Sequence, residues 1–273
     1  MSDKVSIAEF FTWRHHPFAD TYPLSEPFLS NADKRILQRG LSLLSYGKSF
    51  ALYGPSGSGK STVVQHIIAM LDPHHYKPVL IPYGGLRRTG ILKTIADALG
   101  VETAGRQIPL LVKLQNHIMS MNSENNARHP VFVIDDAQLM ERESLLDLCS
   151  LMANPQKKTV ASSLILVGDD TLAKSLSLHV MSPIRTRLTS IFPMEPLTEE
   201  DSRDFIAFRL QNAKAPEHLF ERDVVSLIAA HCQGNRRQIM NLATLLLDEA
   251  FHRHEKTIGP QLFLSCDLVE ISG

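Results

Sequence analysis

Cysteine is scarce in this chain, and no apolar run in it is long. The only cysteines among its 273 residues are Cys149, Cys232 and Cys266, which lie far apart. Their odd number and spacing fit neither a disulfide framework nor a Cys-x-x-Cys metal site, and they suggest a reducing compartment. No run approaches the ~18 apolar residues that span a membrane, and the N-terminus lacks the layout of a signal peptide. We therefore expect a soluble cytoplasmic protein.

The chain also lacks a strong charge of either sign. Its 28 Lys and Arg residues nearly balance 29 Asp and Glu residues, which leaves a formal net charge of −1. Bulk charge therefore does not indicate a nucleic-acid partner, and any basic surface must be local. The 12 histidines have no carboxylate or cysteine neighbours at ligand spacing, so we expect no metal other than magnesium.

What the chain does contain is a glycine-rich phosphate-binding loop, GPSGSGKST, which matches G-x-x-x-x-G-K-[ST]. In such a loop the glycines let backbone N–H groups surround the phosphates, while Lys60 reaches the β- and γ-phosphates and Ser61 binds Mg²⁺. The apolar run Ser49–Tyr53 predicts a strand before the loop, and helical spacing predicts a helix after it. The candidate nucleotide-binding residues are Gly54, Pro55, Ser56, Gly57, Ser58, Gly59, Lys60, Ser61 and Thr62.

Short apolar runs alternate with helical patterns over most of the chain. Strands are expected at residues 50–53, 79–82, 131–134, 164–167 and 191–194. Helices are expected at residues 32–44, 61–71, 91–99, 110–121 and 142–153. This alternation predicts an α/β fold with a parallel sheet covered by helices on both faces.

The pattern changes near residue 198. Three helices are expected at residues 199–211, 221–232 and 236–251 with no strand between them, and one short helix within residues 257–273. We therefore divide the chain into an N-terminal segment (1–48) that leads into the core, an α/β nucleotide-binding domain (49–196) and a small helical domain (197–273).

Acidic residues follow two of the predicted strands. Asp135 and Asp136 come directly after the strand at 131–134, at the sheet edge where parallel sheets bind ligands. There Asp135 can hold Mg²⁺ through water, and Asp136 can polarise an attacking water molecule. Asp169 and Asp170 end another strand. Their position has two interpretations. Their side chains contact the γ-phosphate or the attacking water, or they belong to an ordinary solvated turn.

Arginines are placed at two further points of interest. Arg185 and Arg187 precede the last predicted strand, and Arg236 and Arg237 begin a helix of the second domain. An arginine offers a permanent planar fork of donors, and against a γ-phosphate it raises the rate by roughly 10³–10⁵ in related chemistry. The alternative for the first pair is an ordinary surface position. One arginine of the second pair is placed to report the nucleotide state to the helical domain.

These elements, in this order, resemble the AAA+ ATPases, and more closely the ExeA-type branch related to the transposition ATPases MuB, TnsC and IstB. The resemblance covers nearly the whole chain and implies a P-loop AAA+ domain followed by a helical lid. The HPF segment is similar to the family's NPF motif, which implies that Pro17 and Phe18 lie near the adenine. The segment DDAQ, from Asp135 to Gln138, resembles the family's DEAQ.

Three further matches imply roles for single residues. LILVGDDTL is similar to LVGQPEL, which makes Asp169 the candidate sensor 1. TRL resembles QRI, which makes Arg187 the better candidate for an arginine finger acting on a neighbouring subunit. GNRRQI resembles GNPRRI, which makes Arg237 the candidate sensor 2, acting in its own subunit.

The chain departs from the family pattern at two positions. Asp136 stands where a catalytic glutamate is usual, so its carboxylate is set back by one carbon–carbon bond, ~1.5 Å. Since a misplacement of that size can cost ~10²-fold in rate, we expect slow ATP hydrolysis. Asp169 stands where a glutamine is usual, and an acid near a γ-phosphate is unfavourable unless it binds the metal or faces away.

The resemblance implies an ATP- and Mg²⁺-dependent regulator of DNA transposition. If Arg187 acts on a neighbour, ATP favours a ring or a helical filament of this chain. Loops at similar places line DNA in related transposition ATPases, and repeated basic pairs would bind duplex DNA without reading its sequence. Such an assembly would recruit or activate a transposase. The candidate DNA contacts, which as an alternative are solvated surface residues, are Arg87, Arg88, Lys157 and Lys158.

Two other functions compete with this one. An ExeA-type secretion ATPase carries a membrane span and a cell-wall-binding part, for which we expect no room in a chain that ends at Gly273. A nucleotide-gated scaffold that binds ATP and scarcely hydrolyses it is compatible with Asp136.

Overall fold

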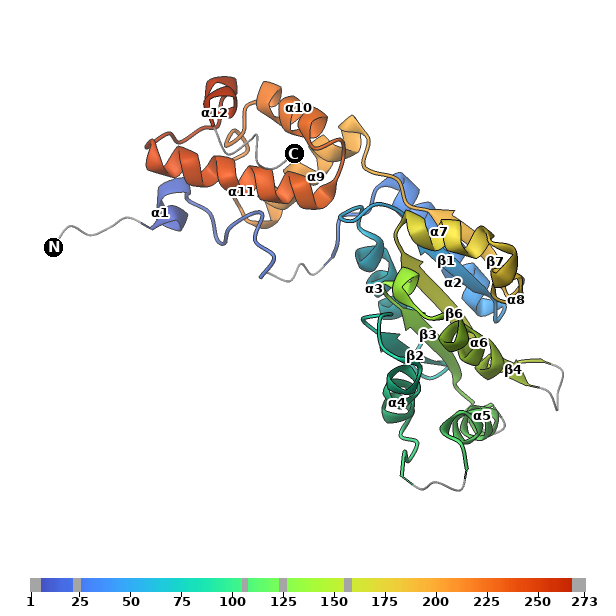
Figure 1. The fold of residues 1–273 in the computed structure, drawn as a ribbon. Coiled ribbons are helices and arrows are strands. Elements are labelled where there is room, and N and C mark those ends of the chain that lie inside the picture. The colour runs from blue at the N-terminus through green and yellow to red at the C-terminus, as the bar shows by residue number, and fades with distance from the viewer. Residues whose placement is uncertain (1–5, 22–25, 105–107, 123–126, 155–158, 267–273) are drawn as a thin grey trace. The chain divides into compact units, whose positions relative to one another are not determined.

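The computed structural model describes residues 6–21, 26–104, 108–122, 127–154 and 159–266. They fall into two compact units, which we call the α/β unit (residues 31–55 and 60–194) and the helical unit (residues 1–30, 56–59 and 195–273). The colours of Figure 1 separate the helical C-terminal part from the sheet-containing part. No described helix is both long and apolar enough to cross a membrane.

This grouping differs from the sequence-based division at the N-terminus and in the phosphate loop. Residues 31–48 belong to the α/β unit, because helix α2 (Asn31–Ser45) packs on its first strand: a Cβ on Gly40 would lie 3.1 Å from the ring of Phe50. Residues up to 30 belong to the helical unit, because Phe11, Trp13 and Phe18 are buried in its core. The loop tip, residues 56–59, also groups with the helical unit.

The α/β unit is built on a five-stranded sheet of order β2-β3-β6-β1-β7 in which every neighbouring pair is parallel. All five predicted strands are present: β1 (Ser49–Tyr53), β2 (Tyr76–Ile81), β3 (His129–Ile134), β6 (Ser163–Gly168) and β7 (Leu188–Pro193). A two-residue antiparallel pair that the sequence pattern does not predict, β4 (Ala153–Asn154) with β5 (Thr159–Val160), forms a second sheet.

The predicted helices of this unit are present within a few residues. They are α2, α3 (Lys60–Met70), α4 (Arg88–Leu99), α5 (Leu110–Met121) and α6 (Arg142–Leu151). Two helices were not predicted, α7 (Asp170–Ser177) and α8 (Ser182–Arg185), and two single 3₁₀ turns accompany them, η1 (Ala137–Leu139) and η2 (His179–Met181). Both unpredicted helices are short, at eight and four residues.

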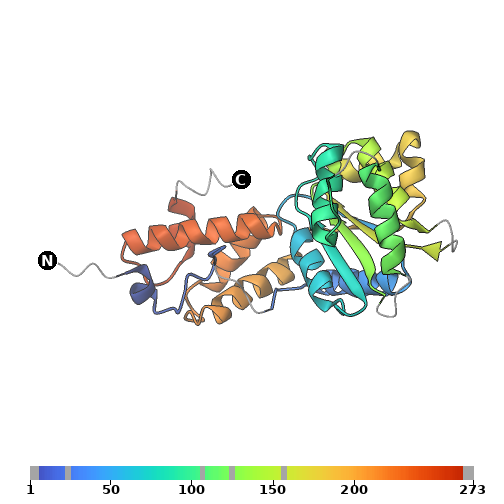
Figure 2. The ribbon, with the colours of Figure 1, turned by 90° about the horizontal axis from the view of Figure 1, so that it is seen from below.

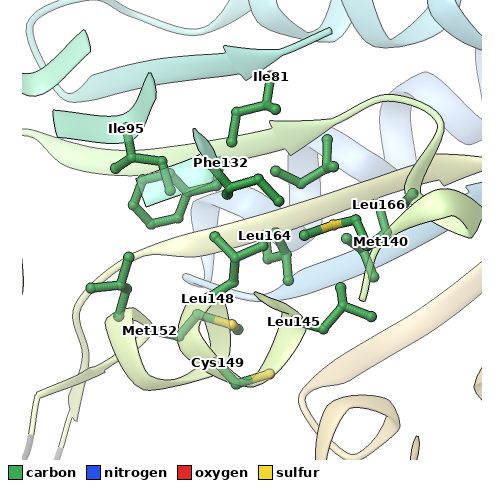
Figure 3. Packing of buried hydrophobic residues seen from close by; sticks show 14 of the residues in the cluster. Ile81, Ile95, Phe132, Met140, Leu145, Leu148, Cys149, Met152, Leu164 and Leu166 are labelled. Atoms are coloured by element: carbon green, nitrogen blue, oxygen red, sulfur yellow. The ribbon is translucent and has the colours of Figure 1, made fainter. Parts of the chain in front are cut away.

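Successive side chains of a strand point to opposite faces of the sheet, and here the side chains on both faces are buried. Phe132 and Ile134 of β3 and Leu164 and Leu166 of β6 belong to one core cluster, to which α4, α5 and α6 contribute. Figure 3 shows Phe132 and Leu164 of that face beside Ile95, Leu148 and other residues of the covering helices. Alternate residues such as Phe50 lie outside this cluster and face α2 and α3 instead. A fully buried sheet therefore explains the nearly continuous apolar strands.

The helical unit has a separate core. Its helices are α1 (Ile7–Phe11), α9 (Glu199–Asn212), α10 (Arg222–His231), α11 (Arg236–His252) and α12 (Pro260–Ser265). Phe10 meets Phe251 edge-on with ring centroids 5.3 Å apart, which places α1 against α11 (Figures 1 and 2). The predicted helices of this region are present, and a single β-bridge joins Phe220 to Ile258. Part of the last predicted segment, residues 267–273, lies outside the described residues.

Candidate nucleotide-binding and catalytic site

Three adjacent strands present the candidate residues at one edge of the sheet. Strand β6 lies between β1 and β3, and all three run in the same direction. Their carboxyl ends therefore lie side by side, and the chain continues from them into Gly54, Asp135 and Asp169. This is the edge at which open parallel sheets bind ligands.

The Lys60 ammonium lies against the start of the phosphate loop. Its Nζ donates hydrogen bonds to the carbonyl oxygens of Gly54 and Pro55, each at 2.8 Å. Burial lowers the pKa of Lys60, and the nearby carboxylates, Asp135 first and then Asp169, oppose that shift. A partly desolvated cation surrounded by strand-end acids is suited to bind the phosphates of a nucleotide–magnesium complex.

The two candidate magnesium ligands are brought together from positions 74 residues apart. The Ser61 hydroxyl donates a hydrogen bond to Oδ2 of Asp135 at 3.0 Å. Hydroxyl and carboxylate oxygens are ligands that Mg²⁺ prefers, so Ser61 and Asp135, the latter through water, are the residues that would hold the ion. Among the residues that the structure describes, no group of three or more His, Cys, Asp or Glu residues is placed to hold a different metal.

Asp136 follows in an unusual backbone conformation. Its φ and ψ are 49° and 39°, in the left-handed region that aspartate and asparagine tolerate better than most residues. Its N–H donates to Oδ1 of Asp135 at 3.0 Å, and its own Oδ1 accepts a hydrogen bond from Nε2 of Gln138 at 3.2 Å. The backbone thus provides a reason for aspartate at this position that is independent of catalytic reach.

Asp169 caps a helix. Its side chain accepts hydrogen bonds from the backbone N–H of Thr171 at 2.8 Å and from the Thr171 hydroxyl, at the N-terminus of α7. The Thr171 hydroxyl bond is the main cause that lowers the pKa of Asp169. Both bonds of the cap end on Oδ1, and a contact of this carboxylate with a phosphate stays a prediction. The carboxylate contributes its charge to the surroundings of Lys60.

In the helical unit, the tip of the phosphate loop contacts the start of α11. Asn235 caps α11 and donates from Nδ2 to the carbonyl oxygen of Ser56 at 2.7 Å. Arg237, the candidate sensor 2, donates from Nη1 to the Ser56 hydroxyl at 3.0 Å. Gly57, at φ 80°, leaves room for this contact, since a Cβ there would lie 2.3 Å from Oδ1 of Asn235.

Pro17 and Phe18, which the resemblance places near adenine, are also held within the helical unit. The buried guanidinium of Arg209 donates from Nε to the Pro17 carbonyl at 2.7 Å. Phe18 is 3% exposed and meets Phe220 edge-on. The Phe18 ring is therefore a packing residue of this core, and a contact of the segment with adenine stays a prediction.

Arg187 lies far along the sheet from the phosphate loop. It directly precedes β7, whose first residue, Leu188, pairs with Ser49 at the beginning of β1. The loop starts five residues later at Gly54, roughly 16 Å along the strand. The Arg187 side chain is exposed and donates from Nη1 to the Pro183 carbonyl at 2.7 Å, and Arg185 donates to the Ser177 carbonyl at 3.4 Å.

The candidate DNA contacts are divided by the structure. Arg87 is exposed at the N-cap of α4. Arg88 forms a two-point ion pair with the buried Asp147 of α6, at 2.5 Å from Nε and 2.7 Å from Nη2. Its charge is therefore largely compensated. Lys157 and Lys158 lie outside the described residues.

Three residues of this site were not identified from the sequence. They are Gln138 and Asn235, whose contacts are given above, and Gly84, whose N–H donates to the Asp135 carbonyl at 2.8 Å. Asn235 has a local sequence signal as an N-cap residue before a helix, and Gln138 ends the DDAQ segment, two residues after Asp136. Gly84 acts through its backbone N–H on a residue that is distant in sequence.

Comparison with known proteins supports this arrangement. Residues 43–176 match a family model described as an AAA domain. General secretion pathway protein A from Aeromonas hydrophila is 24% identical over 239 residues, which cover 84% of this chain and 42% of that protein. The zinc import ATP-binding protein ZnuC from Wigglesworthia glossinidia brevipalpis is 28% identical over 142 residues, which cover 52% of this chain and 56% of that protein. The chain thus spans about half the length of these curated relatives.

Solved structures share the fold. Cdc6p from Pyrobaculum aerophilum superposes with a TM-score of 0.69 at 19% identity, over 90% of this chain and 68% of that one. The Aeropyrum pernix ORC1 protein, solved in complex with DNA, gives 0.65 at 18% identity, over 93% and 68%. The RuvB branch migration motor of Thermotoga maritima gives 0.55 at 19% identity, over 85% and 68%. The predicted P-loop AAA+ fold with a helical second part is confirmed, and together the matches support an AAA+ ATPase.

Proposed function

We propose that this protein hydrolyses ATP slowly, assembles on duplex DNA in its ATP state, and regulates DNA transposition. The observation that carries the ATPase part is the Ser61–Asp135 hydrogen bond of 3.0 Å, which joins the phosphate loop to the end of β3. The match of residues 43–176 to an AAA domain supports the same assignment.

Each residue of the site has a proposed task. Lys60 binds the β- and γ-phosphates, and Ser61 and Asp135 would hold Mg²⁺, which neutralises phosphate charge when bound. Asp136 orients the attacking water and accepts its proton. Arg187 supplies positive charge to a neighbouring subunit, and Arg237 serves its own.

The assembly and the DNA partner rest on two supports. Arg187 directly precedes the first residue of β7, at the opposite end of the strands from the phosphate loop. The site of a neighbouring subunit is therefore a better target for Arg187 than the site of its own subunit. Solved neighbours include the Aeropyrum pernix ORC1 protein in complex with DNA and Drosophila ORC bound to DNA. A ring or helical filament that repeats Arg87, with Lys157 and Lys158, would neutralise many phosphates without reading bases, although the protomer is nearly neutral. The partner it recruits or activates is proposed to be a transposase.

Nucleotide-dependent DNA binding tests the proposal. A random-sequence duplex is mixed with the protein and ATP, ADP or a non-hydrolysable ATP analogue, and the complexes are imaged by electron microscopy. We expect rings or filaments on DNA with ATP or the analogue, and none with Lys60→Ala, which should no longer bind nucleotide. Tight ATP binding by Lys60→Ala would overturn the site assignment, and no DNA binding in any nucleotide state at low salt would overturn the DNA role.

Two alternatives have their own support. The Aeromonas hydrophila relative, at 24% identity, favours an ExeA-type secretion ATPase, for which the same DNA experiment would be negative while ATP is still hydrolysed. A nucleotide-gated scaffold is favoured by Asp136 in place of glutamate. Asp136→Glu separates the scaffold from the enzyme, because a large gain in turnover identifies a site that scarcely hydrolyses ATP, and no gain shows that Asp136 already serves as the base.

A further inference from the structure

Gln138 lies between the two acids that end strands β3 and β6. It is the middle residue of the 3₁₀ turn η1, and it is partly buried. Its Nε2 donates to Oδ1 of Asp136 at 3.2 Å, and its Oε1 accepts from the backbone N–H of Asp169 at 3.3 Å.

The two partners determine which way the amide points. An ionised carboxylate only accepts hydrogen bonds, and a backbone N–H only donates them. The opposite orientation would place the amide oxygen against the carboxylate and the NH₂ group against the N–H, so both contacts would be repulsive. A side chain that carries both a donor and an acceptor satisfies both ends, and glutamine is such a side chain.

The surroundings of Gln138 continue to the phosphate loop. Gly168, the last residue of β6, accepts a hydrogen bond from the Gly54 N–H at 3.2 Å. A Cβ on Gly168 would lie 2.6 Å from Oε1 of Gln138, so glycine provides the space that the amide occupies. A continuous path of contacts thus runs from the first residue of the phosphate loop, through the end of β6, to the Asp136 carboxylate.

We propose that Gln138 is a positioning residue for ATP hydrolysis, which holds the Asp136 carboxylate toward the attacking water and links it to the end of β6. This inference rests on the proposed ATPase function. Asp136 needs such support for two reasons. Its side chain is shorter than the glutamate usual at this position, and its backbone is in the left-handed region. A donor on one carboxylate oxygen fixes the rotation of the group and leaves the other oxygen for the water.

Two substitutions distinguish the hydrogen bond that the Gln138 amide donates from the one that it accepts. Gln138→Glu keeps the shape and an acceptor for Asp169, but it removes the donor and places a second carboxylate beside Asp136. Gln138→Leu removes both contacts. The full chain is assayed for kcat and KM of Mg²⁺-dependent ATP hydrolysis, for affinity toward a non-hydrolysable ATP analogue, and for thermal unfolding.

We expect both variants to lose kcat by roughly 10–100-fold, because about 1 Å of misplacement has a cost of that order. KM and analogue affinity should change by less than about threefold, since Gln138 contacts neither Lys60 nor Ser61. In an Asp136→Asn background, Gln138→Leu should cause no further loss, because two residues that act as one unit are not additive. A purely structural role would lower both the affinity for the analogue and the unfolding temperature, and its effect would add to that of Asp136→Asn.

The outcomes are distinguishable. The role of Gln138 would be overturned if both variants hydrolyse ATP at the wild-type rate. It would also be overturned if the losses of kcat from Gln138→Leu and Asp136→Asn multiply in the double variant. Either result would leave the proposed ATPase activity intact. If Gln138→Leu does not fold, the isosteric Gln138→Glu decides. Analogue binding without any wild-type turnover would overturn the proposed hydrolysis and, with it, this role.

Discussion

At the scale of single residues, the aspartates that follow β3 and β6 differ in what holds them. The Asp169 carboxylate is engaged by Thr171 at the start of α7. The Asp136 carboxylate has one hydrogen bond from Gln138 and stays partly exposed. Each carboxylate thus accepts its side-chain hydrogen bonds on one oxygen, but Asp169 is tied to a helix terminus and Asp136 to the Gln138 amide. We propose that this difference assigns stability to Asp169 and chemistry to Asp136.

Substitution of Asp169 tests its capping role. Asp169→Ala should lower the free energy of unfolding by about 1 kcal/mol, because the first turn of α7 loses its side-chain acceptor, while Asp169→Asn should retain most of it. Urea unfolding of the three proteins measures the difference. A role at the phosphate would instead be favoured if Asp169→Ala and Asp169→Asn lose equal free energy of unfolding, or if Asp169→Asn strongly changes the affinity for ATP.

His129 predicts a dependence of stability on pH. Its Nε2 lies 2.9 Å from the Ser163 hydroxyl, and burial lowers its pKa. The unfolded chain therefore binds a proton at a higher pH than the folded chain does, so stability is retained above about pH 6.5 and is lost as the pH falls below it. Unfolding of wild type and His129→Gln at pH 7.5 and 5.5 should show the larger loss for wild type. An equal loss in both would contradict the assignment to His129.

At the scale of elements, the connection from β2 to α4 is held by a hydrogen bond near its start and by an ion pair at its end. Near its start, Gly84 donates to the Asp135 carbonyl, and at its end Arg88 pairs with Asp147 of α6. A Cβ on Gly84 would lie 2.5 Å from the Asp136 carbonyl oxygen. The connection therefore supports the backbone that carries both site acids.

Gly84→Ala should lower kcat by roughly 10-fold or more, because the carbonyl group of Asp136 must shift to admit the methyl group. Gly90→Ala, in α4, is the matched control. A Cβ there meets Leu86 at an ordinary 3.5 Å, and a helical glycine replaced by alanine should gain about 0.5–1 kcal/mol. Steady-state ATP hydrolysis and thermal unfolding measure both effects, and full activity of Gly84→Ala would show that the contact does not position the acids.

At the scale of the whole molecule, each compact unit holds part of the sequence assigned to the site. Lys60, Ser61 and the strand-end acids belong to the α/β unit, and residues 56–59, in which the Ser56 hydroxyl accepts a hydrogen bond from Arg237, belong to the helical unit. Arg187 directly precedes β7, at the opposite end of the strands from the phosphate loop. We propose that it acts on a second copy of the chain.

Mixing two inactive variants tests the use of Arg187 by a neighbour. Arg187→Ala lacks the finger but keeps an intact site, and Lys60→Ala has the reverse defect. We expect each alone to lose at least about 10³-fold in kcat, and their mixture to recover part of it, because one subunit supplies the arginine and the other the site. ATP hydrolysis is measured across mixing ratios with Arg185→Ala as the control. No recovery, or an active Arg187→Ala, would exclude action in trans.

The sequence by itself determined the fold class, the phosphate loop, the five strands of the main sheet and every described helix longer than eight residues. These follow from local patterns: apolar periodicity is set within a dozen residues, and the loop is one contiguous motif. The α/β fold and its helical second part were predicted in this way and are confirmed. The short helices α1, α7 and α8 were not predicted.

Only the tertiary structure decided how the site residues are used. Ser61 meets Asp135 across 74 positions, and Gln138 meets Asp169 across 31. Asp169 caps a helix and Arg88 pairs with Asp147, contacts that the local sequence does not reveal, and their roles at a phosphate and on DNA stay predictions. Each of these outcomes depends on strand order and helix packing. Those bring together side chains that no local pattern relates, because a hydrogen bond depends on distance in space and not on separation along the chain.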